Sequence, residues 1–340
     1  MIQIAQNEIM QNWPLVWNSP MVSIRCATYN HALYIAQTLD GFLMQKTDFP
    51  FEIVVHDDAS TDKTADIIRE YAAKYPRIIK PIYETENQYS KKDGSLARII
   101  DAACKGKYVA FCEGDDFWVD EKKLQKQVDF LENNPDYGMC YTNFNVYNER
   151  KKTLQPSCFS NQPQKYPSEY DLKKWIVSEG YVAPMTWLVK NSLWQNKRSD
   201  NIPSPDGTFV YFAYFLKNSK VFCMKKETTA TYRIVRGSAV HTVFVENMYK
   251  RYKAFHATQL SLADRYLDEE DKNEAIIAIN KRYYEICLKL FVAIDDKEEI
   301  IQSKKWVKKN WITSILYIVS KIRILRLCYL YLYQFYYKVR

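Results

Sequence analysis

Glycine is scarce in this sequence, with 8 residues in 340, and proline contributes only 12. This composition excludes a collagen-like chain and a flexible, linker-dominated one. Long apolar runs are also missing: in the apolar C-terminal segment the longest uncharged runs, 310–320 and 327–337, have eleven residues each, whereas a bilayer span needs about 20. With 47% apolar and 26% charged residues, the sequence predicts a globular protein with a substantial core.

Paired cysteine motifs are absent as well. The eight cysteines include no CxxC pair and no cysteine-histidine cluster with zinc spacing. The first twenty residues contain Glu8, Asn12 and Pro14 and show no basic start followed by an apolar stretch, so they do not resemble a secretory signal. We therefore expect reduced thiols in the core and a cytoplasmic protein.

Acidic residues are missing from residues 304–340, which hold nine lysines and arginines. The other 39 basic and 40 acidic residues nearly cancel, so the formal charge of +8 belongs to this tail. A basic segment with interleaved Trp, Tyr, Ile and Leu is typical of a helix on an anionic membrane surface. Nucleic-acid arms have fewer large aliphatic residues, so we expect no nucleic-acid partner. A helix packed on the protein or on a partner is the alternative.

A helical wheel of the tail places polar residues on one side of a single long helix. These residues are Lys305, Lys309, Thr313, Ser320, Arg323, Gln334 and Lys338. The arrangement predicts one amphipathic helix that lies along a surface.

Short apolar runs alternate with helical patterns from residue 21 onward. Strands are predicted at 21–27, 53–55, 78–83 and 108–112, and helices at 33–44, 63–74, 96–104 and 121–133. Strands that are apolar on both faces and alternate with helices predict an α/β fold with a mostly parallel, Rossmann-like sheet flanked by helices. Further strands are predicted at 137–147, 182–189 and 220–233, and further helices at 172–178, 208–216 and within 243–295.

Changes in the pattern divide the chain into four segments. They are an N-terminal extension (1–20), the α/β domain (21–242), a helical extension (243–303) and the basic amphipathic tail (304–340).

Two of the predicted strands run into carboxylates. Asp57 and Asp58 follow the strand at 53–55, and Glu113, Asp115 and Asp116 follow the strand at 108–112. Ligands of doubly wound sheets bind at the carboxyl ends of strands. Adjacent carboxylates suit Mg²⁺ or Mn²⁺, whose coordination shell substrate phosphates complete. A helix cap at the first position and a solvated turn at the second are the alternatives.

Three motifs in series resemble the family 2 glycosyltransferases, which have a GT-A fold and include enzymes of bacterial polysaccharide assembly. The motifs are Val22-Ser23-Ile24 leading to Thr28-Tyr29-Asn30, the run from Asp57 to Asp62, and Gly106-Lys107-Tyr108 leading to Glu113-Gly114-Asp115-Asp116. The resemblance covers residues 20–242. It implies an inverting, metal-dependent transfer of a sugar from a nucleotide donor, with UDP favoured, to a saccharide or polyprenyl-diphosphate-linked acceptor.

The resemblance also implies roles for the residues on the donor side. Ala27, Tyr29 and Asn30 match the loop that surrounds the nucleotide base, with Tyr29 stacked on uracil. Asp57 and Asp58 match the pair whose carboxylate accepts a hydrogen bond from the base, and Asp58 is the favoured contact.

The family's metal motif matches the acidic turn. The resemblance places Asp115 towards the ribose, beside Asp116, which ligates Mn²⁺ or Mg²⁺ on the diphosphate. Such a cation offsets charge on the departing nucleotide diphosphate. Arg233 and Arg236 are candidates for neutralising phosphate charge, and His241 is a candidate further metal ligand.

An inverting transfer also requires a general base for the acceptor hydroxyl. Asp206 opens a predicted helix 90 residues after Asp116, where the family usually carries an aspartate, so we expect Asp206 to be this base. Capping the helix is its alternative role, and the two roles are compatible.

Two other functions fit parts of the pattern. A metal-dependent nucleotidyltransferase also uses paired carboxylates, but it normally carries a glycine-rich phosphate loop with a lysine near the amino terminus, which this sequence lacks. A degenerate scaffold at the membrane would show damaged motifs, and these are intact. We therefore expect a peripheral enzyme at the inner face of the cytoplasmic membrane.

Overall fold

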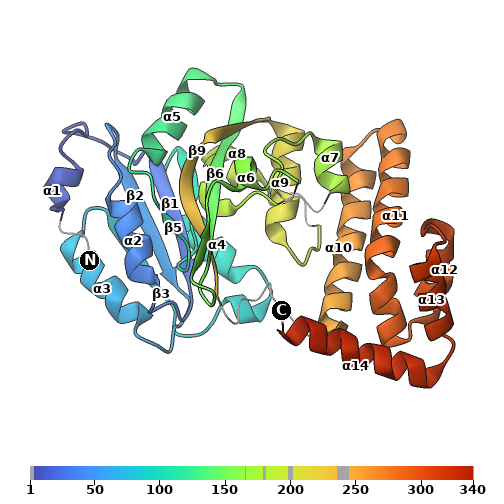
Figure 1. The fold of residues 1–340 in the computed structure, drawn as a ribbon. Coiled ribbons are helices and arrows are strands. Elements are labelled where there is room, and N and C mark those ends of the chain that lie inside the picture. The colour runs from blue at the N-terminus through green and yellow to red at the C-terminus, as the bar shows by residue number, and fades with distance from the viewer. Residues whose placement is uncertain (1–3, 165, 179–180, 198–201, 236–244, 340) are drawn as a thin grey trace. The chain divides into compact units, whose positions relative to one another are not determined.

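The structure is a computed structural model that describes residues 4–164, 166–178, 181–197, 202–235 and 245–339 (Figure 1). The chain forms two compact units. The first unit takes its residues from 1–169, 181–200 and 218–236, and the second takes its residues from 170–180, 201–217 and 237–340.

One sheet organises the first unit. Its nine strands, counted over the described residues, follow the order β3-β2-β1-β4-β8-β6-β9-β5, and β7 pairs with β6. Strands β3, β2, β1 and β4 are parallel, β8 is antiparallel to β4 and β6, and β6 and β9 are parallel to each other. The strands are β1 (Val22–Thr28), β2 (Phe51–Asp57), β3 (Ile79–Tyr83), β4 (Tyr108–Phe111), β5 (Phe117–Trp118), β6 (Tyr137–Asn148), β7 (Thr153–Gln155), β8 (Leu188–Lys190) and β9 (Lys220–Ile234).

Helices cover this sheet because its central strands are apolar on both faces. Every residue of β2 and of β4 is buried, which requires packing on each side. Helix α2 contacts α3, α3 contacts β2 and β3, and α4 contacts β1 and β2 (Figure 1). The helices are α1 (Gln6–Ile9), α2 (Ile35–Leu43), α3 (Thr64–Lys74), η1 (Tyr89–Lys91), α4 (Ser95–Ala103), α5 (Lys123–Asn133), α6 (Cys158–Asn161), η2 (Pro184–Thr186) and α8 (Asn191–Asn196). The prediction of a mostly parallel α/β fold is confirmed.

The segment 182–189 differs from the predicted continuous strand. Residues Pro184–Thr186 form the short 3₁₀ helix η2, and only Leu188–Lys190 form strand β8. Proline has no N–H to donate to a neighbouring strand, so Pro184 favours a turn here.

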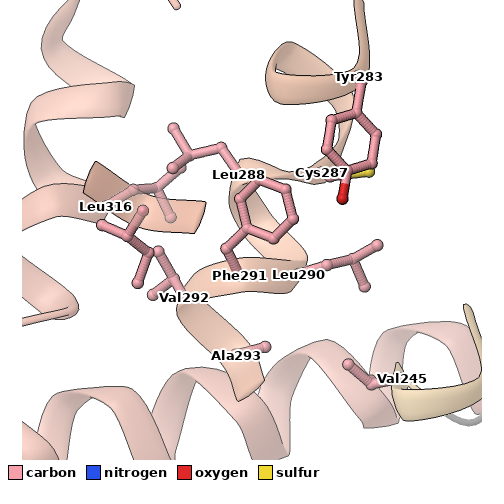
Figure 2. Close-up of a cluster of buried hydrophobic side chains, with 10 residues drawn as sticks. Val245, Tyr283, Cys287, Leu288, Leu290, Phe291, Val292, Ala293 and Leu316 are labelled. Atoms are coloured by element: carbon pink, nitrogen blue, oxygen red, sulfur yellow. The ribbon is translucent and has the colours of Figure 1, made fainter. Parts of the chain in front are cut away.

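The second unit is helical. It contains α7 (Leu172–Val177), α9 (Gly207–Asn218), α10 (Val245–Tyr266), α11 (Glu269–Ile294), α12 (Lys297–Trp306), α13 (Trp311–Val319) and α14 (Arg323–Val339). A buried apolar cluster centred on α11 includes Leu288 and Phe291 and takes in Leu316 from α13 (Figure 2). The helices predicted within 243–295 are confirmed.

The tail does not form the single amphipathic helix that the sequence predicts. Helix α12 ends at Trp306, and α13 starts after Asn310, whose side chain accepts from the backbone N–H of Thr313 at 2.9 Å. The Thr313 hydroxyl in turn accepts from the backbone N–H of Asn310, which completes a capping box. Thr313 is consequently buried and does not belong to an exposed polar stripe. A second break separates α13 from α14, which starts at Arg323.

None of the helices in the described ranges is both long enough and apolar enough to cross a membrane. The cysteines carry free thiols, and all except Cys223 and Cys328 are buried, as expected for core residues.

Candidate active site

The loops after β1, β2 and β4 meet at one edge of the sheet. Thr28, the last residue of β1, pairs in register with Asp57, the last residue of β2, and Arg25 pairs with Phe111, the last residue of β4. Because the three strands are parallel, their carboxyl ends lie together, which is where open α/β sheets bind ligands. The structure therefore brings the two acidic motifs of the sequence to a common edge.

Asn30 ties the loop after β1 to the loop after β2. Its backbone N–H donates to the Ser60 hydroxyl at 2.9 Å, and its side-chain oxygen accepts from the backbone N–H of Thr61 at 2.8 Å. Asn30 has a φ of 55°, a left-handed conformation that asparagine tolerates better than most residues. The preceding side chain, Tyr29, is 43% exposed. The loop thus holds an aromatic ring open to solvent beside the strand ends.

Asp57 and Asp58 are both buried but make different contacts. The carboxylate of Asp58 accepts from the backbone N–H groups of Gln88 and Tyr89, at 2.7 and 3.0 Å. Asp57 accepts from the backbone N–H of Ser60 at 3.3 Å through Oδ2, whereas its buried Oδ1 has no hydrogen-bond partner among the described residues. Asp58 therefore anchors the loop that leads into η1, and Asp57 retains an unused acceptor. The base contact expected of Asp58 stays a prediction.

Gly114 lets the acidic turn pack directly on the loop after β1. Its backbone N–H donates to the carbonyl of Ala27 at 3.0 Å. A Cβ at this position would lie 2.4 Å from the Thr28 hydroxyl and 2.9 Å from Nδ1 of His31. Only glycine fits this close approach, so Gly114 sets the position of Asp115 and Asp116 relative to β1.

His31 lies beside the acidic turn and was missed by the sequence analysis. Its Nε2 is 3.9 Å from an Asp115 carboxylate oxygen, and its Nδ1 is 3.1 Å from the Thr28 hydroxyl. Burial lowers the pKa of His31, although Asp115 and Asp62 oppose this shift, so the ring is neutral at pH 7. Its place two residues after Tyr29, just beyond a strand end, is the signal that could have identified it.

Asp115 and Asp116 differ in exposure. The Asp115 side chain is 22% exposed, whereas the Asp116 residue is 6% exposed. Burial raises the pKa of Asp116 well above the ordinary aspartate value, and the negative charge of Asp115 adds to the shift. One Asp116 oxygen, Oδ1, accepts from the backbone N–H of Arg233 at 2.7 Å.

This donor set fits a divalent cation. Two adjacent carboxylates, one of them buried, present hard ligands whose mutual repulsion a cation would relieve. Among the described residues no group of three or more His, Cys, Asp or Glu side chains could hold a metal ion. A cation here would therefore need further ligands from a substrate, and phosphate oxygens are the usual ones for Mg²⁺.

The guanidinium of Arg233 faces the protein and not solvent, because the residue is only 6% exposed. Its Nε donates to the backbone carbonyl of Asp115 at 2.8 Å, one Nη donates to the Gln37 side chain at 2.6 Å, and the other lies 3.3 Å from a Glu149 carboxylate oxygen. The rings of Tyr34, Phe117 and Tyr147 surround it, with centroids 4.8 to 5.8 Å away. These contacts hold the guanidinium beside the acidic turn, and the phosphate contact expected of Arg233 stays a prediction.

A buried ion cluster lies behind the acidic turn, and sequence reasoning did not find it. Arg25 of β1 pairs with Asp101 at 2.7 Å, and Lys197 reaches the other Asp101 oxygen at 2.9 Å. Burial alone would raise the pKa of Asp101, but Arg25 and Lys197 outweigh it and hold the pKa below its ordinary value. Arg25 also lies 3.8 Å from Glu113. Residues so far apart in sequence give no local signal of this pairing.

Asp206 belongs to the second unit, at the start of α9. Its Oδ1 accepts from the backbone N–H of Thr208 at 3.0 Å and from the Thr208 hydroxyl at 2.5 Å. The capping role is therefore present, while the role as general base stays a prediction. Arg236 and His241 lie outside the described residues.

Comparisons with known proteins agree with this geometry. The sequence matches the model of glycosyl transferase family 2 over residues 23–196. A glucosyltransferase from Escherichia coli, WfaP, described as acting with UDP-Glc on α-D-GlcNAc-diphosphoundecaprenol, is 33% identical over 144 residues, which are 42% of this chain and 53% of WfaP. An uncharacterized protein of Mycobacterium tuberculosis is 45% identical over 122 residues, or 35% of this chain. The match covers 34% of the mycobacterial protein's own length.

Solved structures share the fold at low sequence identity. Staphylococcus aureus TarS 1–349 in complex with UDP-GlcNAc has a TM-score of 0.59 and 20% identity, with 83% of this chain and 79% of that one covered. The mannosyltransferase PcManGT from Pyrobaculum calidifontis in complex with GDP-Man and Mn²⁺ has a TM-score of 0.54 and 16% identity, with 95% and 87% covered. Together with the strand-end motifs and the family match over half of the chain, these findings show that the protein belongs to glycosyl transferase family 2.

Proposed function

We propose that this protein is an inverting glycosyltransferase that moves a sugar from a nucleotide diphosphate donor, with UDP favoured, to a hydroxyl of a saccharide or lipid-linked acceptor. The observation that carries the proposal is the convergence of Tyr29, Asp57 and the Asp115-Asp116 pair at one edge of the sheet. The TarS complex with UDP-GlcNAc supports the choice of nucleotide, and the acceptor named for WfaP supports a lipid-linked saccharide.

Each residue on the side of the nucleotide-sugar donor has a separate proposed role that follows from its chemistry. In this proposal the exposed ring of Tyr29 stacks on the base, and the Asp57-Asp58 pair supplies the acceptor for a base N–H. Asp116 would hold Mn²⁺ or Mg²⁺, and Asp115 would lie towards the ribose. The cation, when bound, stabilises the negative charge that develops on the departing nucleotide diphosphate. The Mn²⁺ complex of PcManGT supports this cofactor.

Asp206 is the proposed general base. It would accept the proton of the acceptor hydroxyl while that oxygen bonds to the anomeric carbon on the face opposite the breaking bond to the diphosphate. The helical segment 243–303 is proposed to shape the acceptor side. The basic tail, 304–340, is proposed to hold the enzyme on the inner face of the cytoplasmic membrane, near a lipid-linked acceptor.

Calorimetric titration with UDP, with and without Mn²⁺, tests the donor site. We expect binding that depends on Mn²⁺ and is lost in Asp116→Ala, whereas Asp129→Ala on the exposed side of α5 leaves it unchanged. If UDP does not bind, the same titration with GDP, CMP and dTDP follows. Failure of all four nucleotides would overturn the proposal.

Asp206→Asn separates the two roles of Asp206. Asparagine caps a helix about as well as aspartate, so thermal stability should be retained while transfer falls by about 10²- to 10⁴-fold, the usual contribution of a general base. Asp268→Asn is the control, because Asp268 also caps a helix, α11, by accepting from the backbone N–H of Asp271. Retained transfer in Asp206→Asn would remove Asp206 from the reaction.

A further inference from the structure

Large apolar side chains that face solvent are concentrated on α13 and α14. Among the described residues, ten of the twenty-one exposed large apolar side chains lie within 311–332. We call these ten residues the outer face. They are Trp311, Ile312, Ile315, Ile318, Ile322, Ile324, Leu325, Leu327, Tyr331 and Leu332. An exposed apolar surface of this kind marks an interaction site.

The opposite side of α13 and of α14 packs against the buried apolar cluster of the second unit. Leu316 of α13 is 7% exposed and belongs to the buried cluster with Leu288 and Phe291 of α11 (Figure 2). Tyr329 and Leu330 of α14 pack against the same cluster. Packing inside the second unit therefore fixes which side of each helix turns outward.

The outer face is continuous along each helix. Trp311, Ile315 and Ile318 are spaced by four and three residues on α13, so they lie on one side of it. On α14, Ile324, Leu327 and Tyr331 are spaced by three and four residues and likewise lie on one side. All six side chains are exposed, so each helix presents an apolar stripe and not scattered single residues.

Within residues 304–340, which carry the outer face, every charged side chain is basic. Lys308, Lys309, Lys321 and Arg323 are exposed, and residues 304–340 contain no acidic side chain. If a second copy of the chain packed against the outer face in the same way, the positive charges of the two copies would repel each other. Lysine is also depleted in protein interfaces. Anionic lipid headgroups attract each nearby lysine or arginine by about 1 kcal/mol, and Trp and Tyr favour the membrane interface. The positive charge therefore favours an anionic bilayer over a second copy of the chain as the partner of the outer face.

We propose that the outer face of α13 and α14 enters the headgroup region of an anionic membrane, while the inner sides of the two helices stay packed on α11. The two helices then lie in the plane of the interface, because only one side of each is open to lipid. This inference deepens the membrane attachment in the proposed function and names the residues that make it. It does not require that the nucleotide be UDP.

A matched pair of substitutions tests the outer face in the full-length protein. Ile318 on α13 is 56% exposed and Ile277 on α11 is 58% exposed, so Ile318→Asp and Ile277→Asp make the same chemical change at equal exposure inside and outside the outer face. Sedimentation with phosphatidylcholine vesicles containing phosphatidylglycerol should show binding that Ile318→Asp weakens about tenfold or more, equivalent to about 1.4 kcal/mol. Ile277→Asp should bind like wild type, and vesicles of phosphatidylcholine alone should bind weakly.

Trp311 provides a second, independent measurement. It is 74% exposed, so brominated lipids should quench its fluorescence, seen as the difference between wild type and Trp311→Phe. Equal vesicle binding by both aspartate variants, or no quenching of Trp311, would overturn the proposal. A dimer in sedimentation velocity that Ile318→Asp dissociates, without vesicle binding, would assign the outer face to a second copy instead. UDP titration of the same proteins reports separately on the proposed function.

Discussion

Arg233 connects the acidic turn to two other parts of the first unit. Its backbone N–H reaches Asp116, and its side chain reaches the Asp115 carbonyl, Gln37 of α2 and Glu149, which follows β6. A planar guanidinium with donors on several sides is suited to such a junction, and lysine is not an equivalent replacement. We therefore expect Arg233 to act on the proposed metal site through the position of the turn.

Arg233→Gln should weaken Mn²⁺-dependent UDP binding by about tenfold or more and reduce stability by about 2–4 kcal/mol, because buried partners lose their donors. Calorimetry with varied Mn²⁺ and urea unfolding measure the two effects. Arg150→Gln is the control, since Arg150 is exposed. Unchanged Mn²⁺ dependence in Arg233→Gln would argue against a positioning role.

Lys123 is a fully buried lysine outside the proposed site. Its Nζ donates to the Gln127 side chain at 2.6 Å and lies 4.4 Å from the centroid of the Trp118 ring. Burial lowers its pKa to about 7, whereas the pKa of a lysine in an unfolded chain is about 10.4. Between these values the unfolded chain binds a proton that the folded protein does not, so Lys123 makes stability rise with pH across this window.

Lys123→Met should remove this pH dependence. One pKa unit corresponds to about 1.4 kcal/mol, and the lost hydrogen bond to Gln127 costs about 1 kcal/mol. We therefore expect the variant to be more stable than wild type by about 1–3 kcal/mol at pH 7, with the difference shrinking towards pH 10. Urea unfolding at several pH values measures it, with the exposed Lys122→Met as control. A difference that is constant with pH would contradict the assignment.

At the scale of elements, the turn after β4 depends on its close contact with the loop after β1. The contact leaves no room for a Cβ at Gly114, where the nearest atoms belong to Thr28 and His31. Thr28 is the last residue of β1, and its backbone carbonyl also accepts from Asp58 at 2.9 Å. Moving this turn therefore disturbs the strand ends that carry both acidic motifs.

Gly114→Ala should abolish measurable UDP binding while the sheet stays folded, because the added methyl displaces the turn and the strand ends beside it and leaves the rest of the buried strands in place. UDP titration and circular dichroism check the two parts of this expectation. Gly207→Ala is the control: a Cβ there would be at ordinary contact distance, 3.5 Å, from its nearest neighbour, the Tyr211 ring. Wild-type affinity in Gly114→Ala would show that the turn can move without loss of function.

At the scale of the whole molecule, the tail has a structural role as well as a charge. A chain ending at Ser303 would lose Leu316, Tyr329 and Leu330 and would expose Leu288 and Phe291 of α11. Burial of apolar surface contributes about 25 cal/mol per Å², so this loss affects stability directly. Deletion of the tail consequently tests more than membrane binding.

We expect the chain ending at Ser303 to melt at a lower temperature than the full-length protein but to retain UDP binding, since the described donor-side residues belong to the first unit. Thermal unfolding and UDP titration make the comparison. Ile318→Asp is the control, because it changes the outer face and leaves Leu316 in place. An unchanged melting temperature would contradict the packing of α13 and α14 on α11.

Much of the fold could be predicted because its signals are local. The buried strands and the parallel order follow from apolar runs such as Ile53 to Val55, and the two acidic motifs could be placed at strand ends for the same reason. The errors also have local causes. Pro184 breaks a run that looked continuous, and the capping box of Asn310 and Thr313 starts a new helix within the tail.

The sequence by itself determined the family, the mostly parallel fold, the acidic motifs and the location of the positive charge, since each depends on residue type and short spacing. Only the tertiary structure decided three contacts of the site. Asp58 anchors the loop that leads into η1, the buried Arg233 donates to the Asp115 carbonyl, and His31 lies beside the Asp115 carboxylate. It also decided which side of α13 and α14 faces outward. Such contacts join residues up to 196 positions apart, as in the pair Gln37 and Arg233, and periodicity carries no information over that distance.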